Sequence, residues 1–79
     1  MIRVLFFGPV ADAVAARQMQ IDFQPGFCLQ DVVSQLTASF PKAFELVCFI
    51  AVNGFQARDM RLVLNDDDEI AFMAKYSGG

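Results

Sequence analysis

Hydrophobic and polar residues in the first third of the chain follow the period of β-strands. Residues 2–7 are apolar apart from one arginine and stop at a Gly-Pro pair, which predicts a strand. Residues 18–23 alternate strictly between polar and apolar side chains, as a strand with one buried face does. Residues 10–16, rich in alanine and valine, predict a short helical turn between them. We therefore expect a hairpin with an elaborated connection.

The period then changes to that of a helix. Apolar side chains between residues 29 and 40 recur at spacings of three and four, which places them on one helical stripe. Pro41 ends this helix, because the residue before a proline is disfavoured in the helical region. The capping position holds Cys28 rather than serine or aspartate, so the start is weakly signalled. The stripe consists of Leu29, Val32, Val33, Leu36 and Phe40.

The second half of the chain returns to strands. Residues 47–52 form an uninterrupted apolar run, typical of a strand buried on at least one face. A tight Asn-Gly turn follows, and residues 55–57 predict a short returning strand. Residues 69–73 predict the last strand, after an acidic turn. This order indicates an α+β fold in which a mixed sheet packs on one main helix.

Strand alternation also predicts which side chains face the helix. If Ile2, Val4 and Phe6 are directed inward, the residues between them are directed outward. The same parity directs Ile70 and Phe72 inward. The outer face is then expected to carry an apolar patch beside the root of the C-terminal segment, made of Leu5, Phe7, Phe49, Ala71 and Met73. Such a patch is typical of a partner site, although packing beneath an unrecognised loop would bury the same residues.

The composition fits one small domain with surplus apolar surface. The 79 residues are 56% hydrophobic and include nine Phe, more than a core of this size can hide. We expect a single domain over residues 1–79, with a body over 1–73 and a flexible C-terminal tail over 74–79. The net charge of −3 and the scattered basic residues argue against nucleic-acid binding. With no apolar run of membrane-spanning length and no signal segment, we expect a cytoplasmic protein without membrane contact.

Conventional catalytic side chains are scarce. The chain has no histidine, which excludes Cys-His and Ser-His pairs and imidazole metal sites. Cys28 and Cys48 form neither a disulfide framework nor a metal motif, and both are expected to be small buried hydrophobes. Carrying sulfur as a persulfide is the alternative role for either thiol. The acidic run at 66–69 lacks the ligand spacing of a calcium loop and is expected to be a solvated turn, so no metal site is predicted.

Several segments combine into a family pattern. They are Ile2-Arg3-Val4-Leu5-Phe6-Phe7-Gly8, Val52-Asn53-Gly54, Leu64 followed by Asp68-Glu69-Ile70-Ala71-Phe72, and the terminal Ser77-Gly78-Gly79. At this length they resemble the ubiquitin-like β-grasp sulfur carriers (the MoaD/ThiS family), and most closely the small subunit of molybdopterin synthase. The resemblance covers the full length and implies a β-grasp fold.

The resemblance implies that the working group is the C-terminal carboxylate. Gly79 would carry it, and Gly78, which has no Cβ, would let it enter a partner's narrow active site. An E1-like adenylating enzyme would activate the carboxylate with ATP, and a persulfide protein would supply sulfur to give a thiocarboxylate. The large catalytic subunit of molybdopterin synthase would use that sulfur for the dithiolene of molybdopterin, within a heterotetramer. This chain would bind no cofactor and would be the non-catalytic, sulfur-donating subunit.

The same resemblance assigns the apolar patch to partner binding. Phe7 and Met73 match contact positions of the family, and Leu5 and Phe49 lie beside them in the predicted sheet. The tail would also be held by the partner, through residues that include Tyr76 and Ser77.

The chain departs from the family pattern at two places. Asp67 stands where a glycine is usual in the last turn, and Lys75-Tyr76 stands where two prolines are usual. Proline would hold the tail extended, so this tail has to be ordered by its partner. Two alternatives use the same C-terminus: a thiamin-pathway or other sulfur carrier, and a ubiquitin-like protein modifier conjugated through Gly79. A non-covalent binding domain would not need the terminal glycines.

Overall fold

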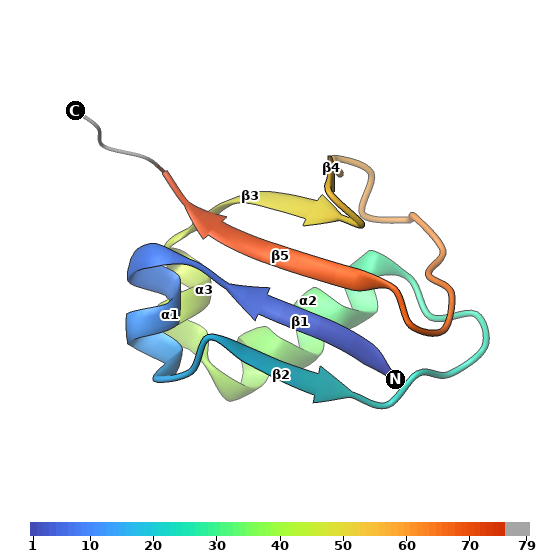
Figure 1. The fold of residues 1–79 in the computed structure, drawn as a ribbon, viewed down its shortest axis with the longest axis horizontal. Coiled ribbons are helices and arrows are strands. Elements are labelled where there is room, and N and C mark those ends of the chain that lie inside the picture. Colours follow the sequence, from blue (N-terminus) through green and yellow to red (C-terminus); the bar gives the residue numbers. More distant parts are fainter. Residues whose placement is uncertain (76–79) are drawn as a thin grey trace.

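Five strands form one mixed sheet in the computed structural model, which describes residues 1–75 (Figure 1). In chain order the elements are β1 (Ile2–Phe6), α1 (Gly8–Val14), β2 (Gln18–Ile21), α2 (Leu29–Ser39), α3 (Pro41–Glu45), β3 (Val47–Val52), β4 (Phe55–Gln56) and β5 (Glu69–Ala74). The strand order across the sheet is β2-β1-β5-β3-β4. The central pair, β1 and β5, is parallel, and the other neighbouring pairs are antiparallel. The predicted α+β class with a mixed sheet is confirmed.

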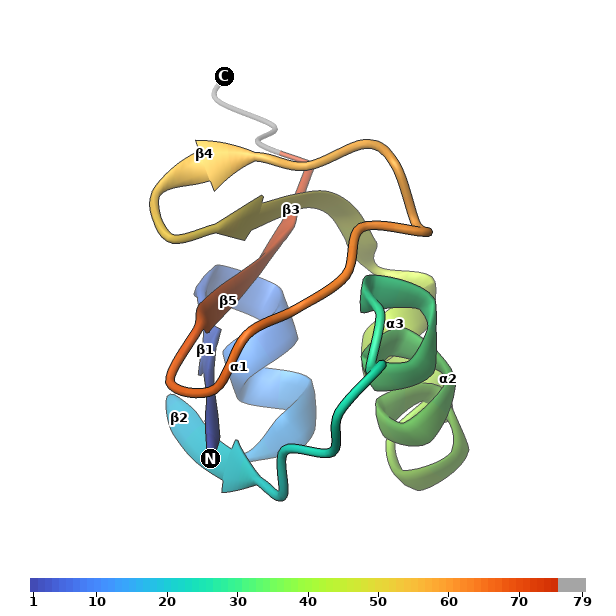
Figure 2. The ribbon, with the colours of Figure 1, turned by 90° about the vertical axis from the view of Figure 1, so that its right-hand side faces the viewer.

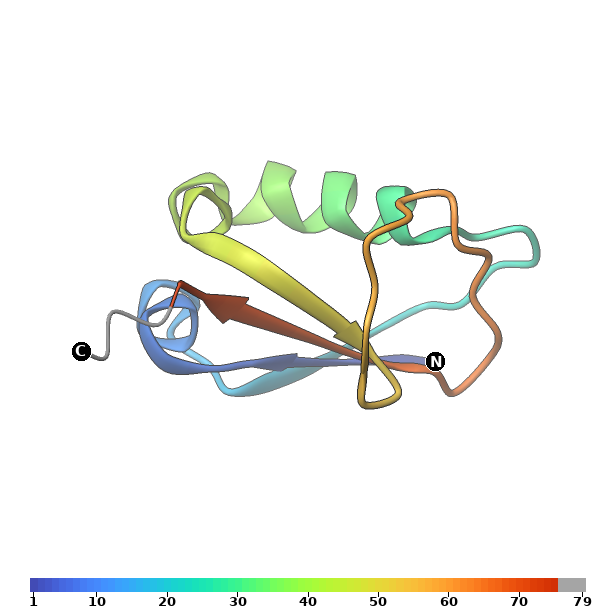
Figure 3. The same ribbon diagram turned by 90° about the horizontal axis from the view of Figure 1, so that it is seen from above.

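The helices α2 and α3 lie on one side of the sheet, with α2 laid across it as the main helix (Figure 2, Figure 3). Helix α1 packs at the end where β1 and β5 finish (Figure 1). Within residues 1–75, the opposite face of the sheet carries no helix. Among the helices of these residues, none combines the length and the apolar character needed to cross a membrane.

The core lies between α2 and the inner face of the sheet, and the predicted strand parity is confirmed. Ile2 and Val4 are fully buried, as are Ile70 and Phe72. The rings of Phe6 and Phe72 stack with their centroids 6.1 Å apart. Helix α2 contributes three members of its predicted stripe to the same cluster: Leu29, Val32 and Leu36.

A hydrogen bond between the Cys28 backbone and Asp31, in the first turn, marks the start of helix α2, and the sequence analysis did not predict it. The Asp31 carboxylate accepts the Cys28 backbone N–H at 2.9 Å. This bond lowers the pKa of Asp31 below its ordinary value. The helix ends at Ser39, and Pro41 opens α3, which the sequence analysis did not predict. Helix α3 brings the Phe44 ring to 4.9 Å from the Phe72 ring, measured between centroids.

The strand predictions are confirmed within a residue or two at their ends. Asn53 and Gly54, with φ of 51° and 86°, form the predicted two-residue turn between β3 and β4. Asp67 has the left-handed φ of 69°, so it fills the turn position where the family usually has glycine. Strand β5 extends to Ala74, one residue past the predicted end of the body. Of the flexible tail predicted over 74–79, Ala74 belongs to β5, Lys75 follows it, and residues 76–79 lie outside the described residues.

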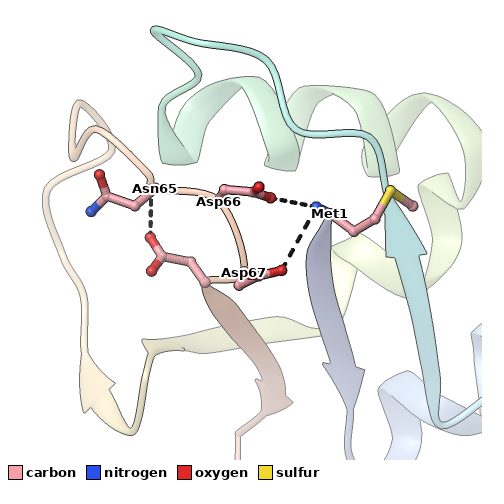
Figure 4. A network of polar contacts seen from close by, with 5 residues as sticks. Met1, Asn65, Asp66 and Asp67 are labelled. Carbon is pink, nitrogen blue, oxygen red and sulfur yellow. Dashed lines mark hydrogen bonds and ion pairs between the residues drawn. The ribbon is translucent and has the colours of Figure 1, made fainter.

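Polar contacts fix the end of the molecule at which β5 starts (Figure 4). The N-terminal ammonium of Met1 donates to the Asp66 carboxylate at 2.5 Å. The Asp68 carboxylate accepts the backbone N–H of Asn65 at 2.7 Å and the side-chain amide of Asn53 at 2.9 Å. These contacts join β1 to the turn before β5 and the turn before β4.

We expect Asp66→Asn to lower the free energy of unfolding mainly between pH 3.8 and 8.0. The Asp66 hydrogen bond raises the pKa of the N-terminal ammonium above 8.0, so its contribution is complete below pH 8.0 and is lost as pH rises through the raised pKa. The same bond lowers the pKa of Asp66 below 3.8, so that contribution is lost as pH falls through the lowered value. Urea unfolding across pH, with Asp12→Asn as the exposed-carboxylate control, checks this. A gap between wild type and Asp66→Asn that does not vary with pH would contradict it.

Candidate functional site

The uncovered face of the sheet holds the predicted apolar patch. Leu5 lies opposite Ala71 in the parallel pair, and Met73 lies opposite Phe49 in the antiparallel pair. Phe7 follows β1 directly, and its side chain is 49% exposed, close to the 43% of Phe49. The other members are half-buried. We call this surface the apolar outer face; it consists of Leu5, Phe7, Phe49, Ala71 and Met73.

The direction of the Phe7 side chain is set by the backbone on either side of it. Its N–H donates to the Phe72 carbonyl at 3.1 Å, which extends the β1–β5 ladder by one residue. The backbone of Phe7 is therefore extended, and its side chain points away from the buried Phe6. Gly8 then takes a φ of 57°, a value that L side chains rarely adopt, and turns the chain into α1.

A hollow of about 490 Å³ opens in the apolar outer face where β5 ends. Phe7 and the start of α1 form one side, and Phe49 with Met73 forms the other. Lys75, the last described residue, also lines it, so the tail begins at this hollow. The complete lining is Phe7, Gly8, Pro9, Phe49, Met73, Ala74 and Lys75.

A β-bulge in β3 decides which β3 side chains reach this face. Val47 pairs with Ala74 and Phe49 pairs with Met73, so Cys48 is an extra residue between the two pairs. The bulge keeps Val47 packed on the core and Phe49 on the outer face. It also exposes Cys48, and the prediction that this thiol is buried is wrong. Cys28 is half-buried at the start of α2.

Carboxylates of the acidic run at 66–69 are engaged by polar groups of the chain itself. The Asp66 and Asp68 carboxylates bind the N-terminal ammonium and the Asn65 backbone (Figure 4). In the part of the chain that the structure describes, no cluster of three or more acidic, cysteine or histidine side chains is placed to hold a metal ion.

The structure brings four of the predicted site residues together: Leu5, Phe7, Phe49 and Met73. The other four lie outside the described residues: Tyr76, Ser77, Gly78 and Gly79. Sequence reasoning missed Pro9 and Lys75 as parts of the hollow. The Gly-Pro pair was interpreted only as the end of a strand, although a proline at the first positions of a helix is itself a signal of a helix start.

Fold and site together define a β-grasp domain whose C-terminal strand leads out of an exposed apolar face. The fold matches solved structures across nearly the whole chain. SAMP1 from Haloferax volcanii superposes with a TM-score of 0.83, at 19% identity, covering 99% of this chain and 98% of that one. Subunits 1 and 2 of the molybdopterin-converting factor from Helicobacter pylori form a solved complex, with one chain matching at a TM-score of 0.74. That match is 25% identical and covers 99% of this chain and 97% of the other.

The sequence comparisons identify the family. The ThiS family model matches residues 4–79. A molybdopterin synthase sulfur carrier subunit from Mycobacterium tuberculosis is 32% identical over 81 residues, covering 99% of this chain and 96% of the relative. The chain therefore belongs to the ThiS family. It is of the sulfur-carrier type and has a ubiquitin-like β-grasp fold.

We expect Phe6, in the core, and its neighbour Phe7, on the apolar outer face, to differ sharply in their contribution to stability. Phe6→Ala removes a buried ring and should lower the free energy of unfolding by about 3–5 kcal/mol. Phe7→Ala removes a half-exposed ring and should change it by less than about 1 kcal/mol. Urea unfolding of the two variants measures the difference. Equal losses would show that Phe7 belongs to the core and not to the outer face.

Proposed function

We propose that this chain is the sulfur carrier subunit of a molybdopterin synthase, with sulfur carried as a thiocarboxylate on Gly79. The observation that supports this most strongly is the near full-length similarity to the Mycobacterium tuberculosis sulfur carrier subunit. The apolar outer face adds support, because a carrier has to be held by its body while its C-terminus reacts. The hollow at Lys75 puts that surface at the root of the tail.

The proposed chemistry begins with activation, because a free carboxylate is a poor electrophile. A carboxylate oxygen of Gly79 attacks the α-phosphorus of ATP in the adenylating enzyme, and pyrophosphate leaves. The terminal sulfur of a donor's persulfide then attacks the acyl carbon and AMP leaves, which forms an acyl disulfide. A thiol then attacks the donor's sulfur of that disulfide, forms a new disulfide with the donor and releases the Gly79 thiocarboxylate. The large subunit takes this sulfur for the dithiolene of molybdopterin.

The composition fits a chain that supplies a substrate arm and leaves the acid–base work to partners. It has no histidine, and the acidic turn is engaged at the far end of β5. The two terminal glycines allow close approach of a partner's backbone and of ATP to the reacting carbon. The partners are an E1-like adenylating enzyme, a persulfide donor and the large subunit. The solved complex of the Helicobacter pylori subunits supports the last of these.

We expect the intact protein, incubated with its cognate adenylating enzyme, ATP and a persulfide donor, to exchange one oxygen for sulfur. Intact mass measurement detects the exchange, and fragmentation places it on Gly79. The double variant Cys28→Ser/Cys48→Ser should give the same product, because neither thiol takes part. A chain lacking Gly79 should give none.

Three results would contradict this proposal. The first is an unchanged mass with an adenylating enzyme that is active on another carrier. The second is the appearance in cells of high-mass conjugates that vanish when Gly79 is deleted, which would favour a protein modifier. The third is a carrier that remains active with an uncleaved extra residue after Gly79, which would exclude the Gly79 carboxylate as the reacting group.

We expect Phe7→Glu and Met73→Glu to weaken binding to the large subunit by tenfold or more, on the order of 2 kcal/mol. The physical reason is the cost of placing a carboxylate in an apolar interface. Titration calorimetry with the purified large subunit measures the effect. Phe55→Glu is the matched control, because Phe55 is 79% exposed and lies on β4, away from the apolar outer face. Equal weakening by Phe55→Glu would argue against this docking face.

A further inference from the structure

A second hollow, of about 470 Å³, lies on the other side of Phe7. It shares Phe7 and Gly8 with the apolar hollow at the tail root. Its remaining lining is more polar and includes Asp12, Arg17 and Gln18. A partner surface that covers Phe7 therefore borders on both hollows, and on the charged side chains of the second.

Backbone contacts fix the position of the Arg17 backbone beside this face. The Arg17 carbonyl accepts the Phe6 N–H at 2.9 Å, and the next residue, Gln18, pairs with Leu5. The side chain of Arg17 is exposed and forms no ion pair within residues 1–75. In the same part of the chain, Arg3 pairs with Glu69 and Arg61 pairs with Asp59.

Covering an exposed guanidinium without an acceptor is costly. Contact with a partner removes water from the charge, and the loss is offset only if the partner supplies hydrogen-bond acceptors. A carboxylate is the best match, since it can accept two parallel bonds from the guanidinium. Asp12 stands on the α1 wall of the hollow without an ion pair to Arg17. Its negative charge opposes any carboxylate that enters this hollow, so the pairing with Arg17 has to outweigh that repulsion.

We propose that Arg17 is a specificity determinant of the docking face: the large subunit that covers Phe7 places a carboxylate in the second hollow, opposite the Arg17 guanidinium. This inference rests on the proposed function. It adds a charged contact to an interface whose centre is apolar. The apolar centre supplies affinity, and the charge pair selects partners, because a partner without the carboxylate leaves Arg17 covered and unpaired.

The test compares full-length variants for binding to the purified large subunit at low and high salt. Arg17→Glu should weaken binding by about tenfold at low salt, and Arg17→Gln by less, with both effects shrinking at high salt. Arg58→Glu makes the same change of charge at an exposed arginine away from both hollows and should stay within about twofold. Thermal unfolding verifies that each variant is folded. Arg17→Gln keeps the test valid if Arg17→Glu does not fold.

The outcomes separate this inference from the proposed function. Equal effects of Arg17→Glu and Arg58→Glu, together with loss of binding in Phe7→Glu, would overturn the role of Arg17 and leave the docking face intact. Full binding by Phe7→Glu would overturn the docking face itself. A weakening by Arg17→Glu that does not depend on salt would also contradict a charge pair.

Discussion

The parallel pairing of β1 with β5 is the constraint on which the rest of the structure depends. Its register places Phe6 opposite Phe72, and these two rings stack in the core. Because side chains alternate along a strand, the next residues, Phe7 and Met73, are directed to the other face. A slip of one residue would exchange the two sets and place the core residues in water. One register therefore determines both what is buried and what is offered to a partner.

The position of β5 relates this constraint to function. It is the central strand of the sheet by pairing with β1 and β3, so its path is held from both sides. The chain leaves it at Ala74 and Lys75, beside the apolar hollow. In the proposed mechanism, binding free energy from the outer face is used to hold a short tail in a partner's active site. The body then needs no catalytic side chain, which agrees with a chain without histidine.

Much of this arrangement could be predicted from the sequence, because alternation and helical spacing are local patterns. They predicted the strands, the main helix and the outer position of Phe7, Phe49 and Met73. These local patterns failed for features that depend on contacts between residues far apart in the sequence. The exposure of Cys48 follows from a bulge set by pairing with β5, far along the chain. The pairing of Met1 with Asp66 joins groups that are 65 positions apart. Helix α3 is only five residues long and leaves too short a stripe to detect.

The two ends of the sheet differ in how completely their polar groups are satisfied. At the end where β5 starts, the ammonium of Met1 and the carboxylates of Asp66 and Asp68 find partners inside the chain. At the end where β5 finishes, Phe7 and Phe49 are exposed, and the Arg17 guanidinium has no ion-pair partner within residues 1–75. Exposed apolar side chains also lie at the opposite end, where Phe55 is 79% and Val63 is 62% exposed, so apolar exposure alone does not select a docking surface. The end where β5 finishes is distinguished by its position: its apolar hollow is lined by Lys75, from which the chain continues to Gly79. Docking there brings a partner next to the group that the proposed reaction uses.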